Sequence, residues 1–227
     1  MKIGIIFAIE EELNAFKELI KINKEYTIFD LTFYEGETNN ITCVFVQCGV
    51  GKVNAARTTQ ILIDNMKVDY IFNVGVAGGI DESLKVGDIV IGEKLVQHDF
   101  DVTPFDYKKG QIPNVGTFIE SDDYLIKIAK KCLKTAKKGI IASGDIFVTE
   151  EWMSKKINKK FNALCCEMEG ASIAQVCFLS HIPFLVIRSI SDVPNNNNVI
   201  TYEEFVESSS TVIANGMLKI INNLERM

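Results

Sequence analysis

The chain has 227 residues, of which 47% are hydrophobic and 24% are charged, and its formal net charge at pH 7 is −6. This balance is typical of a folded globular protein and argues against a disordered chain. The negative charge argues against a nucleic-acid-binding protein, because such a protein needs a basic surface to contact phosphates. A chain of this length can bury one substantial core, so we expect a single domain over residues 1–227.

Short apolar runs, which are typical of buried strands, alternate along the chain with segments of helical spacing. In chain order we expect a strand over residues 3–9, a helix over 10–20, a hairpin of strands over 27–35 and 41–47, a helix over 53–66, strands over 69–74 and 86–98, an irregular segment over 99–116, a helix over 122–136, a strand over 139–148, a helix over 150–158, a strand over 163–166, a helix over 169–180, a strand over 183–190, a loop over 194–198 and a helix over 202–224. This order predicts an α/β fold with a mixed, largely parallel central β-sheet flanked by helices.

The six cysteines follow no metal-site or disulfide spacing, since Cys165 and Cys166 are adjacent and no Cys-x-x-Cys pair occurs. We therefore expect buried free thiols, a cytoplasmic location, and neither metal nor cofactor. The apolar start of the chain runs into Glu10, Glu11 and Glu12, which fits a first strand better than a signal peptide. No apolar run reaches the roughly 20 residues that a membrane helix needs.

Three acidic residues stand at or just beyond the ends of predicted strands, namely Glu12, Glu169 and Asp192. Ligands of open α/β sheets bind outside the carboxyl ends of the strands, so we expect these acids to face one site. Carboxyl groups without histidine or cysteine partners suit the cleavage of a glycosidic bond. One acid protonates the leaving group and a carboxylate activates water.

Seven segments in order along the chain resemble the methylthioadenosine/S-adenosylhomocysteine nucleosidase family of the nucleoside phosphorylase superfamily. They are MKIGIIFAIEEE at 1–12, CGVGKVNAA at 48–56, NVGVAGG at 73–79, HDFDVTPF at 98–105, SGDIFV at 143–148, CEMEGASIAQVC at 166–177 and RSISDVP at 188–194. The resemblance implies a nucleoside phosphorylase-like fold and hydrolysis of the N-glycosidic bond of methylthioadenosine and S-adenosylhomocysteine, with 5′-deoxyadenosine as a further candidate substrate. The products are adenine and a 5-thio-substituted ribose, which implies a place in methionine salvage and in the recycling of S-adenosylmethionine by-products.

The resemblance also implies roles for the site residues. Glu12 matches the base that activates water, and Asp192, aided by Ser191, matches the acid that delivers a proton toward N7 of adenine. Glu169 matches the residue that holds the ribose hydroxyls, with Met168 packed against the sugar. The remaining matches are Arg188 near the water and ribose, Phe147 stacked on adenine, the Val148 backbone reading the adenine edge, and an apolar pocket for the 5′ substituent made by Ile9, Val50, Tyr202, Val102, Phe105 and Tyr107.

In the family the loop that carries Val102, Phe105 and Tyr107 comes from a neighbouring subunit, so the resemblance implies a homodimer. Exposed aromatic residues in the 99–116 segment agree with this, because aromatic residues are enriched at interfaces. One substrate-binding position departs from the family, which commonly has Ser where this chain has Val76.

Two alternatives remain at the level of sequence. A purine nucleoside phosphorylase of the same superfamily needs a phosphate site, but its relatives resemble R-V-G-S where this chain has Asn73-Val74-Gly75-Val76, and the acids at 10–12 would repel a dianion. A non-catalytic nucleoside-binding protein is the second alternative, because a fold does not fix a function. It would have no need for a water-activating carboxylate such as Glu12.

Overall fold

The computed structural model describes residues 1–193 and 198–225, without the side chains of residues 198–201. Residues 194–197 of the predicted loop therefore lie outside the described residues. The strands are β1 Lys2–Phe7, β2 Ile22–Ile28, β3 Leu31–Thr38, β4 Ile41–Gln47, β5 Tyr70–Gly79, β6 Ile89–Gln97, β7 Ile119–Glu120, β8 Lys137–Ser143, β9 Ala163–Glu167 and β10 Phe184–Asp192. The α-helices are α1 Glu10–Lys17, α2 Lys52–Ile61, α3 Asp123–Cys132, α4 Glu151–Phe161, α5 Gly170–Ser180 and α6 Asn198–Ile221, and one π-helical turn, Leu62–Met66, continues α2.

The strands form one mixed sheet in the order β10-β6-β8-β9-β5-β1-β4-β3-β2, and a further β5–β10 pairing closes the first five strands into a ring. The parallel pairings are β1 with β4 and β5, β10 with β5, and β8 with β6 and β9. The other five pairings among the described strands are antiparallel. The predicted α/β class with a mixed sheet is confirmed, although the sheet is less parallel than predicted.

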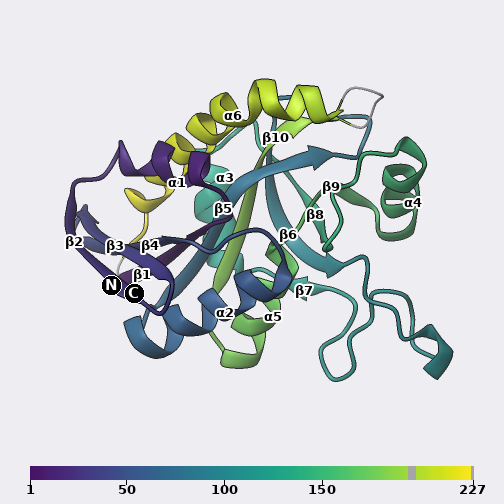
Figure 1. Ribbon diagram of the computed structural model, residues 1–227, viewed down its shortest axis with the longest axis horizontal. Coiled ribbons are helices and arrows are strands. Elements are labelled where there is room, and N and C mark those ends of the chain that lie inside the picture. The colour runs from purple at the N-terminus through teal and green to yellow at the C-terminus, as the bar shows by residue number, and fades with distance from the viewer. Residues whose placement is uncertain (194–197, 226–227) are drawn as a thin grey trace.

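Helices cover both faces of the sheet, with α1, α3 and α6 on one face and α2 and α5 on the other (Figure 1). Side chains of β1 point alternately to the two faces of the sheet, and those on both faces are apolar. Ile3, Ile5 and Phe7 pack in the same apolar cluster as residues of α1, α3 and α6, whereas Ile6 packs with residues of α2 and α5. A strand that is apolar on both sides is stable only between two layers of helices.

Three strand predictions were wrong at their bounds. The predicted strand over 139–148 ends early, because β8 stops at Ser143 and residues 144–148 form a loop. The predicted strand over 27–35 spans a turn, because Phe29 adopts a φ of 57° and the chain reverses between β2 and β3. β2 itself was missed, since it is polar and largely exposed and gives no apolar run. β5 was predicted to end at Val74, but it continues through the glycine-rich residues to Gly79.

The six cysteines are free, and five of them are buried, as predicted. Throughout residues 1–193 and 198–225, no helix combines the length and the apolar character needed to cross a membrane.

Candidate active site

Glu12 is buried in the first turn of α1, where its carboxylate accepts hydrogen bonds from three backbone amides. Oε2 accepts from the amides of Ala8 at 2.8 Å and Ile9 at 3.3 Å, and Oε1 accepts from the amide of Val76 at 2.8 Å. The side chain therefore joins the end of β1 to the middle of β5. Burial raises the pKa of Glu12, while the positive charge of Arg188 and the three amides oppose that rise.

The glycine-rich stretch of β5 gives Glu12 its place. A Cβ on Gly75 would lie 2.3 Å from Oε1 of Glu12, so any larger residue would displace the carboxylate. Gly78 lies in the same way against Asp192, where a Cβ would be 3.2 Å from Oδ2. Gly75 and Gly78 thus stand where acidic side chains approach the strand closely.

Glu169 directly precedes α5 and is 5% exposed. Its Oε1 accepts a hydrogen bond of 2.8 Å from the amide of Gly51, just before α2. Burial, and then the negative charge of Glu167, raise the pKa of Glu169 to about 8, against the opposing effects of Arg188 and the Gly51 amide. Near neutral pH this carboxyl group is therefore poised between its two protonation states.

Asp192 is the last residue of β10 and is 3% exposed. The hydroxyl of Ser191 donates to Oδ1 of Asp192 at 2.9 Å. Burial raises the pKa of Asp192, and this hydrogen bond opposes the rise. A carboxyl group with a raised pKa keeps its proton closer to neutral pH, which suits a general acid.

All three acids line one cavity at the carboxyl ends of β1, β9 and β10, and its empty volume, including the open mouth, is about 670 Å³. The predicted site residues that line it are Ile9, Glu12, Val50, Val76, Phe147, Val148, Met168, Glu169, Ser191, Asp192 and Tyr202. The rings of Phe147 and Tyr202 pack edge to face, with 5.6 Å between their centroids, and both line the cavity.

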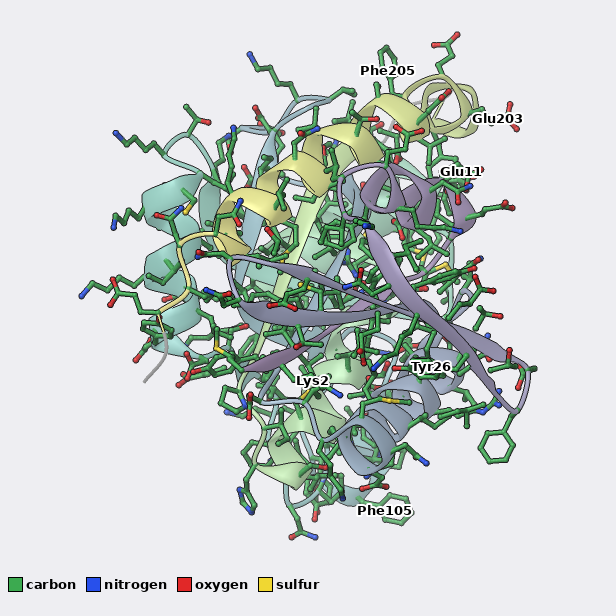
Figure 2. The ribbon with its side chains drawn as sticks, turned by 90° about the vertical axis from the view of Figure 1, so that its left-hand side faces the viewer. Lys2, Glu11, Tyr26, Phe105, Glu203 and Phe205 are labelled. Atoms are coloured by element: carbon green, nitrogen blue, oxygen red, sulfur yellow. The ribbon has the colours of Figure 1, made fainter. Side chains whose placement is uncertain are left out.

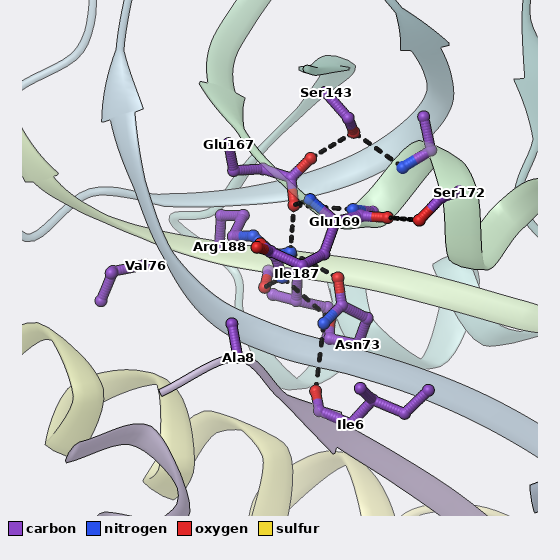
Figure 3. Close-up of polar contacts among 12 residues, drawn as sticks. Ile6, Ala8, Asn73, Val76, Ser143, Glu167, Glu169, Ser172, Ile187 and Arg188 are labelled. Carbon is purple, nitrogen blue, oxygen red and sulfur yellow. Dashed lines mark hydrogen bonds and ion pairs between the residues drawn. The ribbon is translucent and has the colours of Figure 1, made fainter. Parts of the chain in front are cut away.

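Four predicted site residues do not line this cavity. Arg188 lies behind it, fully buried, with its guanidinium donating to Glu167 and to Asn73 (Figure 3). Val102, Phe105 and Tyr107 lie on the segment between β6 and β7, which projects from the body of the molecule (Figure 1).

The lining also contains residues that sequence reasoning missed, namely Ala8, Ala77, Gly78, Ile146, Cys166 and Glu167. Most of them neighbour predicted residues on the same strand end or loop, so their position in the motifs was the available signal. Within the ranges that the structure describes, no group of three or more His, Cys, Asp and Glu side chains could hold a metal ion.

The loop that carries Ile146, Phe147 and Val148 is braced at its start by a small polar network. The amide of Asp145 donates to Oδ2 of Asp99 at 3.0 Å, and Oδ1 of Asp145 accepts from the amide of Lys52 at 2.8 Å. The Lys52 ammonium donates to Oδ1 of Asp99 at 2.7 Å. The network therefore ties this loop to the same α2 terminus that contacts Glu169.

Residues 2–222 match the model of the phosphorylase superfamily. A 5′-methylthioadenosine/S-adenosylhomocysteine nucleosidase from Halalkalibacterium halodurans is 41% identical over 228 residues, which cover 98% of this chain and 99% of the relative. The chain belongs to the methylthioadenosine/S-adenosylhomocysteine nucleosidase family.

Solved structures of this nucleosidase family and its neighbours have the same fold. The nucleosidase of Helicobacter pylori, in complex with an aminopyrrolopyrimidine–pyrrolidine ligand that carries a thioether, superposes with a TM-score of 0.96 at 34% identity and 99% coverage of both chains. A structure described as futalosine hydrolase of the same organism gives a TM-score of 0.96 at 33% identity, covering 99% of this chain and 98% of that one. The family resemblance seen in the sequence is thereby confirmed.

Proposed function

We propose that this protein hydrolyses the N-glycosidic bond of 5′-methylthioadenosine and S-adenosylhomocysteine and releases adenine. The observation that carries the proposal is the placement of Glu12, Glu169 and Asp192 around one cavity. The relatives with this activity in their names cover the chain almost from end to end.

The reaction begins at the base. Phe147 stacks on adenine, and the backbone of Val148 reads its edge. Asp192, whose pKa burial raises, gives its proton to N7 as the bond between C1′ and the base breaks and the electron pair of that bond moves to adenine. Protonation makes adenine a better leaving group, which is the usual contribution of a general acid.

Departure of the base leaves positive charge on the ribose. The carboxylate of Glu169 holds the ribose hydroxyls and stabilises that charge, and Met168 packs against the sugar. Glu12 takes one proton from a water molecule as the oxygen of that water attacks C1′. Burial raises the basicity of Glu12, and the three amides fix its direction.

Water, rather than phosphate, is the nucleophile. None of the cavity-lining residues among those described is Arg, Lys or His, and three of the lining acids are Glu12, Glu169 and Asp192. Arg188, whose positive charge acts on Glu12 and Glu169, donates to Glu167 and to Asn73. A phosphate dianion would meet like charge without a compensating partner, which disfavours a phosphorylase.

The protein acts as a homodimer in which Val102, Phe105 and Tyr107 reach the neighbouring site and cover the 5′ substituent. Phe105 is 74% exposed and lies at the edge of the molecule in Figure 2, away from Glu11. A large exposed aromatic side chain on a projecting segment supports an interface. Sedimentation of the wild type should give a dimer, and Phe105→Ala should raise KM for methylthioadenosine. The equally exposed Phe29, on the β2–β3 turn, supplies the control variant Phe29→Ala.

We also infer a cytoplasmic location, which the free cysteines support.

The substrate range is tested with a panel of methylthioadenosine, S-adenosylhomocysteine, 5′-deoxyadenosine and futalosine, the last because a structure with that hydrolase name has the same fold. Release of the free base is measured for the wild type and for Glu12→Gln. We expect rapid release of adenine from the thio-nucleosides by the wild type only. Binding of these nucleosides without base release would instead indicate a non-catalytic binding protein.

A further inference from the structure

Glu167, which lines the cavity but has no role in the proposed reaction, is the centre of a buried polar network (Figure 3). Its Oε1 accepts from the hydroxyl of Ser143. Its Oε2 accepts from the guanidinium of Arg188 and from the amides of Glu169 at 3.1 Å and Gly170 at 2.7 Å. One carboxylate therefore has four donors, which come from β8, β10 and the start of α5.

Two of these contacts fix the backbone that carries Glu169. The amides of Glu169 and Gly170 lie at the N-terminus of α5, where a helix favours a negative charge. The Ser143 hydroxyl oxygen also accepts from the amide of Ala171 at 2.7 Å, so Ser143 and Glu167 together hold three successive amides. The position of the Glu169 side chain follows from this anchoring.

The contact between Glu167 and the Arg188 guanidinium determines the net charge near Glu169. Arg188 is fully buried, and besides Glu167 it contacts Asn73 and the carbonyl oxygen of Ile187. Glu167 offsets the positive charge of Arg188, which would otherwise act in full on the neighbouring carboxyl groups.

The charged and titratable groups around Glu169 come from several elements. Glu167 of β9 and Glu12 of α1 oppose its ionisation, and Arg188 of β10 favours it. Burial, and to a lesser extent the negative charge of Glu169, raise the pKa of Cys48, after β4, and of Tyr202 of α6. Both side chains are therefore protonated at neutral pH. Glu167 and Arg188 are thus the largest opposing charges.

We propose that Glu167 is a positioning residue whose buried carboxylate sets both the place and the ionisation of Glu169 by holding Arg188 and the first amides of α5. The proposal rests on the proposed role of Glu169 at the ribose. Glu167 itself contributes no proton to the reaction.

The test variant is Glu167→Gln, because a glutamine can keep the geometry without the charge. Its oxygen can replace Oε2 toward the amides and Arg188, and its amide group can donate to the Ser143 oxygen. With the negative charge removed and Arg188 unopposed, we expect the pKa of Glu169 to fall by about one or more. The acid limb of the kcat/KM profile moves to lower pH by the same amount, since an ionised Glu169 holds the ribose hydroxyls.

The pKa of Glu169 is measured in the substrate-free full-length protein by carbon NMR of labelled glutamate side chains, with the signal assigned by loss in Glu169→Gln. This readout does not depend on turnover, so it decides the proposal even if the nucleosidase activity is absent. Ser143→Ala is the matched control, because it removes a hydrogen bond from Glu167 but leaves every charge. In that control we expect the pKa of Glu169 to stay within a few tenths of its wild-type value, on the order of the effect of one distant contact.

The proposal is overturned if Glu167→Gln lowers the melting temperature but leaves the pKa of Glu169 and the acid limb of the kcat/KM profile at their wild-type positions. Glu167 would then have a purely structural role. Where that variant does not fold, the double variant Glu167→Gln/Arg188→Met removes both buried charges, a change that proteins often tolerate. Because the negative charge of Glu167 raises the pKa of Glu169, the pKa of Glu169 in this double variant should be lower than in the single variant Arg188→Met, which keeps Glu167. An equal or higher value in the double variant contradicts the proposal.

Discussion

Replacing Glu169 with glutamine should stabilise the substrate-free protein at high pH while it impairs catalysis. The buried carboxyl group has a pKa raised from 4.5 to about 8, and a change of one in pKa corresponds to about 1.4 kcal/mol. Its ionisation therefore costs the folded state on the order of 5 kcal/mol once the pH exceeds both values. Since the folded pKa is raised, the unfavourable contribution of Glu169 is absent below pH 4.5 and grows as the pH rises toward 8. A glutamine keeps the acceptor for the Gly51 amide and has no charge to bury.

The assay is urea unfolding of the wild type and Glu169→Gln at one protein concentration, at about pH 5 and about pH 9. We expect the free energy of unfolding of the variant, relative to the wild type, to increase by roughly 4 kcal/mol between these two pH values. The exposed Glu11 on α1 provides the control Glu11→Gln for the loss of one negative charge. A difference between variant and wild type that is the same at both pH values would refute the argument that Glu169 is held against its ionisation.

Further variants test the acids and their packing. Glu12→Gln should lower kcat by about 10²- to 10⁴-fold, the usual contribution of a general base, whereas Glu11→Gln should retain wild-type turnover in the same adenine-release assay. Asp192→Asn should lower kcat over the same range of about 10²- to 10⁴-fold, and the loss should be smaller for a nucleoside whose base leaves more readily without protonation; an equal loss for every leaving group would remove Asp192 as the acid. Gly75→Ala should cost at least about tenfold in kcat, or 1.4 kcal/mol, because the added Cβ would lie 2.3 Å from Oε1 of Glu12. Gly78→Ala, where the nearest Asp192 oxygen is at 3.2 Å, should be milder in the same kinetic comparison, and the reverse order would show that Glu12 tolerates displacement.

The fold class and the three acids could be predicted because each left a clear signal in the sequence. Apolar runs such as 3–9 mark strands buried on both faces, and acids at the ends of such runs have few roles outside a binding site. Glu12, Glu169 and Asp192 were found in this way, and the structure brings them to one cavity. The edge strand β2 left no such signal, since most of its residues are polar or exposed and form no apolar run.

The environment of each acid could not be predicted from the sequence. The pattern Glu167-Met168-Glu169 does not reveal which acid holds Arg188, since that depends on where β8 and β10 place their side chains. The residues that hold Arg188 left no signal in the sequence either, since its two terminal nitrogens donate to Glu167, Asn73 and Ile187. Pairing of buried charges is a three-dimensional property, and residues far apart in the chain decide it.

The dependence of adenine release on phosphate tests the central claim most directly. Methylthioadenosine is incubated with the protein in phosphate-free and in phosphate-rich buffer of equal ionic strength, and the sugar product is examined by phosphorus NMR. Hydrolysis by Glu12-activated water predicts equal rates of adenine release in both buffers and a sugar product without phosphorus. Release that occurs only with phosphate, together with a sugar 1-phosphate, would contradict the account.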